Sequence, residues 1–164
     1  MKHVLNANCV RLALIVVLAG VAALVVGENR ASAQQGPYIT QASERLGKLV
    51  DKGNKNGFTL QKNSFSIGGG WLKKSKEWVP IYSVELKAGK EYRFLAAGDD
   101  DAKDVDLRVM SPKGNQVAID ADVDRDAIVN FTPKVSGRYT VEIRLYSSRD
   151  DLDAVVLSVM MSAK

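Results

Sequence analysis

The sequence predicts an all-β fold: an antiparallel β-sandwich of the jelly-roll or Greek-key kind, preceded by one amphipathic helix. After Gly57, apolar and polar residues alternate in six or more short runs, spaced at about ten-residue intervals with turn residues between them. No run after Gly57 is long and helical enough to form the crossover that a parallel sheet requires. We therefore expect three parts: a leader over residues 1–33, a lead-in and helix over 34–56, and the sandwich over 57–164.

The first 33 residues have the pattern of a cleavable signal peptide. Lys2 and Arg11 precede an uncharged apolar stretch over residues 12–26, and Ala31-Ser32-Ala33 has the small-x-small form of a signal peptidase site. The stretch is shorter than the ~20 residues that a membrane-spanning helix needs, so a retained anchor is the less favoured alternative. We expect cleavage after Ala33, export to the periplasm or the medium, and no stable membrane insertion afterwards.

The chain has one histidine and one cysteine, His3 and Cys9, and both lie in this leader. A mature chain over residues 34–164 would lack the histidine charge relay, the thiol nucleophile and the disulfide. We therefore expect that the protein is not an enzyme. The alternative is a small hydrolase that uses carboxylates. The whole chain has 23 basic and 19 acidic residues, and the leader has three basic and one acidic, so the mature chain keeps 20 basic and 18 acidic residues. So small a positive surplus gives no ground for a nucleic-acid partner.

The helix is predicted from an apolar stripe at helical spacing, formed by Ala42, Leu46, Leu49 and Val50. Thr40 or Ser43 can cap its start, and Lys52 and Gly53 mark its end, which gives about three turns. The stripe is narrow and lacks aromatic residues, so packing on the neighbouring sheet is favoured over lying on a membrane.

The strands are predicted from period-two alternation, in order along the chain. The expected runs cover residues 58–60, 65–67, 78–86, 92–96, 105–109, 117–119, 127–131, 139–145 and 155–161. Gly68-Gly69-Gly70 is expected to break the chain between strands, and Pro80 indicates an edge strand or a bulge. Tyr139, two residues after Gly137, has the position of a tyrosine corner, whose hydroxyl bonds back to the chain upstream.

From about residue 78 to 162, the order of short motifs resembles the bacterial pre-peptidase C-terminal domain, a β-sandwich module of secreted proteins. The matching pieces are residues 84–92, 104–109, 111–115, 129–133 and 136–141. The resemblance implies a non-catalytic module, of a family in which such domains often follow a secreted protease and some bind calcium. No protease precedes the module here, so we expect it to act through a partner or ligand of its own.

Aspartates form two groups that could supply oxygen ligands to calcium from two loops. The candidate ligands are Asp99, Asp100, Asp101, Asp104, Asp106, Asp120, Asp122 and Asp124. An EF-hand is excluded because Arg125 stands where its loop needs glycine and Phe131 where it needs glutamate. Solvated loops with their charge partly neutralised by Lys103, Arg108 and Arg125 are the alternative interpretation.

Trp71, Trp78 and Tyr82 are candidates for an aromatic platform on which sugar rings could stack, and a place in the core or over a sheet edge is the alternative. Between the two tryptophans, Lys73, Lys74 and Lys76 could contact an anionic polymer. Taken together, the sequence predicts an exported, non-catalytic β-sandwich that binds an extracytoplasmic protein or a polysaccharide, with calcium as a candidate ion. A structural or assembly protein of the cell envelope is a further alternative.

Overall fold

A computed structural model describes residues 36–60 and 65–164. The predicted leader and its cleavage site lie outside the described residues. Of the unit Met1–Pro37, only Gly36 and Pro37 are described, and both are helical. The second unit, Tyr38–Lys164, holds the rest of the described chain. None of the helical segments in the described ranges is both long and apolar enough to cross a membrane.

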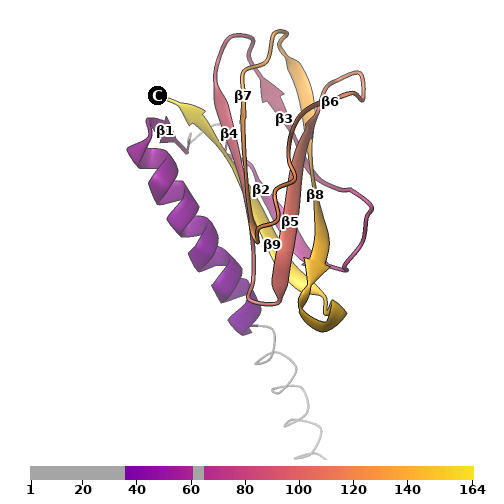
Figure 1. The fold of residues 1–164 in the computed structure, drawn as a ribbon. Helices are drawn as coiled ribbons and strands as arrows, with labels where there is room; N and C mark the ends of the chain where they lie inside the picture. Colours follow the sequence, from indigo (N-terminus) through magenta and orange to yellow (C-terminus); the bar gives the residue numbers. More distant parts are fainter. Residues whose placement is uncertain (1–35, 61–64) are drawn as a thin grey trace, which may run out of the picture. The chain divides into compact units, whose positions relative to one another are not determined.

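One helix and nine strands make up the described chain (Figure 1). The helix covers residues 36–55. The strands are β1 Phe58–Thr59, β2 Ile67–Leu72, β3 Val79–Leu86, β4 Tyr92–Gly98, β5 Ala102–Met110, β6 Gln116–Asp120, β7 Asp126–Phe131, β8 Gly137–Ser148 and β9 Ala154–Ala163. A short 3₁₀ turn, Arg149–Asp151, joins β8 to β9.

The strands form two antiparallel sheets, which confirms the predicted fold class. In sheet A, β1 and β2 both pair with β9, which pairs with β4, and β4 pairs with β7. Sheet B has the order β3-β8-β5-β6. Because β4, β7 and β9 belong to sheet A while β3, β5 and β8 belong to sheet B, the chain crosses repeatedly between the two sheets.

The core lies between the sheets and follows the predicted alternation. Tyr92, Phe94 and Ala96 of β4 belong to the same buried cluster as Val105 of β5 and Ile143 of β8. Their alternate neighbours point out of the sandwich, because successive side chains of a strand face opposite sides. The alternation predicted the core-facing residues of β4, β5, β7 and β8 correctly. It was wrong on β6, where Val117 and Ile119 are exposed, and on β9, where Val159 and Met161 face the helix and not the opposite sheet.

The helix packs on the outer face of sheet A, as its apolar stripe predicted. Leu46 belongs to a second buried cluster with Leu95 of β4 and with Val159 and Met161 of β9. Gly53 lies so close to β9 that an added Cβ would be 2.5 Å from the Met161 sulfur. The missing side chain thus allows the last turns of the helix to approach the strand.

The predicted ends of the helix were wrong on both sides. Helical structure is already present at residue 36, so Thr40 and Ser43 lie inside the helix as exposed residues. The helix also continues through Gly53 to residue 55 and stops before Gly57, which has a φ of 85°. Packing against Met161 outweighs the poor helix propensity of Gly53, and Gly57 is the glycine that supplies the left-handed turn.

The predicted break at Gly68-Gly69-Gly70 was also wrong, since these glycines lie inside β2 and pair with β9. A Cβ on Gly69 would come within 2.1 Å of the Val156 carbonyl oxygen, and one on Gly68 within 2.9 Å of the Tyr82 ring. Glycine is therefore needed where β2 approaches both β9 and the edge of sheet B.

Two predictions about single residues of the sheets are confirmed. Pro80 lies in the edge strand β3, and the register shifts between Pro80 and Tyr82. The Tyr139 hydroxyl donates a hydrogen bond to the Val135 carbonyl oxygen at 2.8 Å, as expected of a tyrosine corner.

Candidate functional site

Three aspartate-rich loops gather at one end of the sandwich, which we call the acidic end: residues 99–101, 121–125 and 149–153. The strand register places them together, because Ala97 pairs with Asp126, Gly98 with Val156 and Ala102 with Ser148. The predicted convergence of two acidic loops is therefore present, with a third loop added by the connection between β8 and β9.

Asp99 is fully buried and organises the loop between β4 and β5. One carboxylate oxygen accepts the backbone N–H groups of Asp101 at 2.9 Å and Ala102 at 3.2 Å, and the other accepts that of Val155 at 2.7 Å. Both oxygens are occupied by backbone donors, so this carboxylate holds the loop against β9.

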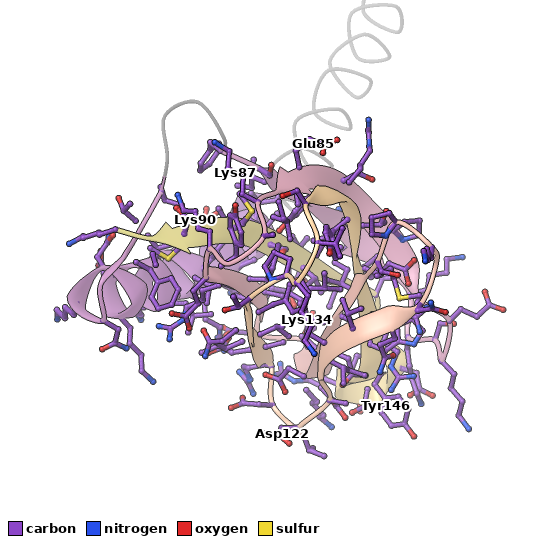
Figure 2. All side chains as sticks on the ribbon, turned by 90° about the horizontal axis from the view of Figure 1, so that it is seen from above. Glu85, Lys87, Lys90, Asp122, Lys134 and Tyr146 are labelled. Atoms are coloured by element: carbon purple, nitrogen blue, oxygen red, sulfur yellow. The ribbon has the colours of Figure 1, made fainter. Side chains whose placement is uncertain are left out.

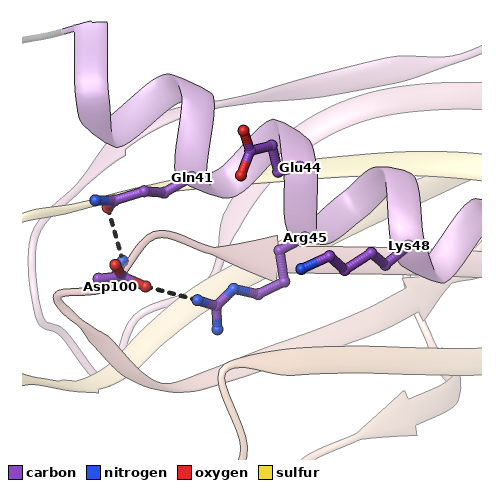
Figure 3. A pocket seen from close by; sticks show the side chains of 5 residues that line it. All are labelled: Gln41, Glu44, Arg45, Lys48 and Asp100. Atoms are coloured by element: carbon purple, nitrogen blue, oxygen red, sulfur yellow. Dashed lines mark hydrogen bonds and ion pairs between the residues drawn. The ribbon is translucent and has the colours of Figure 1, made fainter.

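Asp100 faces the helix and lines a pocket of about 410 Å³ with Gln41, Glu44, Arg45 and Lys48 (Figure 3). Arg45 donates to the Asp100 carboxylate at 2.7 Å, and the Asp100 backbone N–H donates to the Gln41 side-chain oxygen at 3.2 Å. These contacts tie the helix to the loop, and the mixed charges of the pocket largely neutralise one another.

Asp104 and Asp106 lie near each other on β5, and both are buried. Asp106 forms an ion pair with Arg144, whereas one oxygen of Asp104 is buried without a hydrogen-bond partner among the described residues. Burial and the charges of Asp106 and Asp124 raise the pKa of Asp104, and Arg144 opposes that rise.

The second aspartate group is used mainly to shape its own loop. Asp120 accepts the backbone N–H groups of Asp122 and Ile128, and Asp124 accepts that of Arg125. Asp122 is exposed and lies at the periphery of the domain (Figure 2).

Most of the candidate calcium ligands therefore lie towards one end of the domain. Most of these carboxylates accept backbone N–H groups or form ion pairs with arginines. Within residues 36–60 and 65–164, no group of three or more acidic, histidine or cysteine side chains is placed to hold a metal ion. Calcium binding stays a prediction of the sequence, and a calcium titration of the purified protein tests it.

The three predicted platform residues lie in different surroundings. Trp71 is on β2 and is 44% exposed. The Trp78 ring contacts the guanidinium groups of both Arg108 and Arg144, whose central carbons lie 4.4 and 4.5 Å from its centroid. Tyr82 reaches from sheet B towards sheet A, where its hydroxyl lies 3.2 Å from that of the buried Ser158. Burial raises the pKa of Tyr82.

These three aromatic residues consequently do not form one platform. Trp71 alternates with the inward-facing Leu72, so it lies on the outer face of sheet A. Arg108 and Arg144 alternate with core residues of β5 and β8, so Trp78 covers the outer face of sheet B.

Trp71 has an aromatic partner that the sequence did not reveal. Its ring meets that of Tyr38 edge-to-face, with centroids 5.3 Å apart and planes at 61°. The two rings border a groove of about 450 Å³, which we call the Tyr38–Trp71 groove, lined by Tyr38, Trp71, Asp101, Asp151, Leu152 and Asp153. No sequence pattern indicates this pairing, because 32 intervening residues, including β1, separate the two aromatic residues.

Three of the lining residues, Asp151, Leu152 and Asp153, belong to the loop between β8 and β9. Asp150 and Asp151 both have positive φ angles, of 49° and 59°, which are uncommon outside glycine. Lys74 forms an ion pair with Asp151 at 2.5 Å, and Arg149 one with Asp101 at 3.5 Å. Asp153 has no hydrogen bond or ion pair with any residue in the described ranges. The groove thus combines an exposed indole with carboxylates held on a tight turn.

No family model matches the chain, and no curated protein matches it. Solved structures with some similarity include the periplasmic inhibitor of g-type lysozyme PliG from Aeromonas hydrophila, with 16% identity over 65% of this chain and 92% of that chain and a TM-score of 0.41. A β-1,3-glucan binding CBM6 from Bacillus halodurans has 16% identity over 62% and 87%, with a TM-score of 0.36. Scores this low do not bear on the function of this chain.

Proposed function

We propose that this protein is an exported, non-catalytic module that binds a glycan in the Tyr38–Trp71 groove. The observation that carries the proposal is the exposed indole of Trp71, held edge-to-face by Tyr38 beside three carboxylates. A non-catalytic role is also what the resemblance to the pre-peptidase C-terminal domain implies.

The groove has the chemistry that sugars require. An aromatic ring can cover the apolar face of a pyranose, and carboxylates accept hydrogen bonds from its hydroxyl groups. A volume of about 450 Å³ lies within the usual range for small-ligand sites. Such sites combine aromatic walls with a few polar groups that orient the ligand.

The indole stands on a rigid support. All six residues of β2 pair with β9, and Trp71 itself pairs with Val155. The backbone N–H of Val155 donates to the buried Asp99 carboxylate, which also accepts the backbone N–H of the lining residue Asp101. A preorganised groove loses little conformational entropy when a ligand binds.

The proposal that the protein is not an enzyme is based on its sequence. With the leader removed, residues 34–164 contain no histidine and no cysteine, so the common nucleophile and base pairs cannot form. Detection of glycan hydrolysis by the purified protein, lost on substitution of a single aspartate, would overturn this part.

The test is a glycan array followed by calorimetry on the positive ligands. Trp71→Ala is expected to weaken binding about tenfold or more, because it removes the stacking surface. Tyr146→Ala is the matched control, since Tyr146 is a similarly exposed aromatic residue (42%) on β8 in sheet B. No glycan bound, or equal affinity after Trp71→Ala, would overturn the proposal.

A further inference from the structure

We infer that the ligand of the Tyr38–Trp71 groove is a glycan that carries positively charged amino groups, such as a chain of glucosamine units that are not acetylated. This inference rests on the proposed function and names the class of sugar. The ligand would lie on the exposed ring of Trp71 and the half-buried ring of Tyr38, and the charge of the surrounding residues would select it.

All the charged side chains that line the groove are acidic. Asp101, Asp151 and Asp153 contribute carboxylates, and no basic side chain lines it. The three loops of the acidic end contain eight aspartates and two arginines. The field at the groove mouth is therefore negative, which attracts cations and repels anions.

The nearby cations do not cancel this charge. Lys74 contacts Asp151, with both side chains well exposed to water, and Arg149 contacts Asp101. Asp153 is exposed and has no such partner in the part of the chain that the structure describes. At least one lining carboxylate thus remains available to an incoming ammonium group, with which it can form a charge-assisted hydrogen bond.

The aromatic rings favour the same ligand. The face of an indole attracts an ammonium group by the cation–π interaction, which contributes about 0.5–1 kcal/mol at exposed sites. The apolar face of a glucosamine ring can stack on Trp71 while its amine points to a carboxylate. A neutral sugar keeps only the stacking and hydrogen bonds, and a uronic acid is repelled.

Calorimetry of the protein with a glucosamine hexamer and an N-acetylglucosamine hexamer, at pH 5.5 and low salt, tests the inference. The charged hexamer is expected to bind about tenfold tighter, and added salt should narrow the difference. Equal affinity of the two hexamers would overturn the inference and leave the proposed glycan function standing. If no glycan binds at all, it is the proposed function that fails.

Matched variants identify where the charge acts. Asp153→Asn should weaken binding of the glucosamine hexamer about threefold or more and leave the acetylated hexamer unchanged. Asp122→Asn makes the same charge change at the acidic end but outside the groove lining, and should have little effect. An equal loss of affinity in Asp153→Asn and Asp122→Asn would show that the charge does not act in the groove and would overturn the inference. Tighter binding of polylysine than of the glucosamine hexamer would also overturn it, because the protein would then recognise positive charge without the sugar.

Discussion

Asp99 shows how much of this domain depends on single polar side chains. It is the only residue in the described ranges whose carboxylate accepts three backbone N–H groups, two from its own loop and one from β9. In the sequence it is one of a run of acidic residues and a candidate calcium ligand. In the fold it satisfies backbone donors that burial would otherwise leave unpaired, which is a structural role.

We therefore expect Asp99→Ala to be strongly destabilising. The substitution leaves the N–H groups of Asp101, Ala102 and Val155 without an acceptor, at a cost of about 3 kcal/mol or more. Asp122→Ala is the control, because its exposed side chain makes no hydrogen bond within the described ranges. Urea unfolding measures both, and equal midpoints for the two variants would contradict the assigned role.

Tyr139 provides a second prediction for a single side chain. Tyr139→Phe keeps the ring contact with Phe131, whose centroid is 5.5 Å away, and removes the hydrogen bond to Val135. We expect a loss of about 1 kcal/mol of unfolding free energy. Tyr146→Phe removes a hydroxyl from an exposed ring and should leave the thermal midpoint unchanged.

At the scale of elements, glycines decide how closely β2 and the helix approach β9. Gly69 in β2 and Gly53 in the helix both face β9, from the edge of sheet A and from its outer face. Their sequence context indicated a break at the first position and a helix end at the second. In both cases the close approach of a neighbouring element outweighs the local propensity.

The same substitution at two glycines should have opposite effects on stability. Gly69→Ala places a Cβ 2.1 Å from the Val156 carbonyl oxygen at a φ of 137°, so we expect a loss of more than about 2 kcal/mol. Gly47→Ala meets no atom within 4 Å in the helix and should gain about 0.5–1 kcal/mol. Thermal unfolding of both variants checks this, and a stable Gly69→Ala protein with β2 still paired to β9 would contradict it.

For the whole molecule, charge is divided between the two ends of the sandwich. The acidic end carries the three aspartate-rich loops, whereas Lys87, Lys90 and Lys134 lie on the β3–β4 and β7–β8 loops at the opposite end. The buried carboxylate of Asp104, on sheet B, adds a pH dependence to the stability of the domain. Asp104 and Asp106 are close together on one strand, yet only Asp106 has an arginine partner.

Asp104 should destabilise the fold when it is ionised. Its pKa is raised on folding, so the folded state binds its proton more tightly than the unfolded state does. The stability contributed by the protonated form is complete below the ordinary pKa of 3.8 and is lost as the pH rises through the raised pKa. Asp104→Asn should therefore raise the unfolding free energy at pH 7. It should also make the unfolding free energy depend less on pH above pH 3.8.

Asp106→Asn is the contrasting variant, because it removes the charge partner of Arg144 from a residue that is 2% exposed. It should lower the unfolding free energy by about 2 kcal/mol at pH 7. Urea unfolding at several pH values measures both variants. A drop in stability for Asp104→Asn at pH 7 would contradict the assigned effect of its burial.

The sequence by itself determined the two-sheet fold, the core-facing residues of β4, β5, β7 and β8, the apolar stripe of the helix and the hydrogen bond of Tyr139. These features follow from local periodicity and from short turn motifs, which each segment carries on its own. The tertiary structure alone decided that Trp71 meets Tyr38, that Trp78 contacts two arginines, and that Asp99 accepts hydrogen bonds from backbone N–H groups. It also decided that three glycines continue a strand, because each of these outcomes depends on residues brought together from distant parts of the chain.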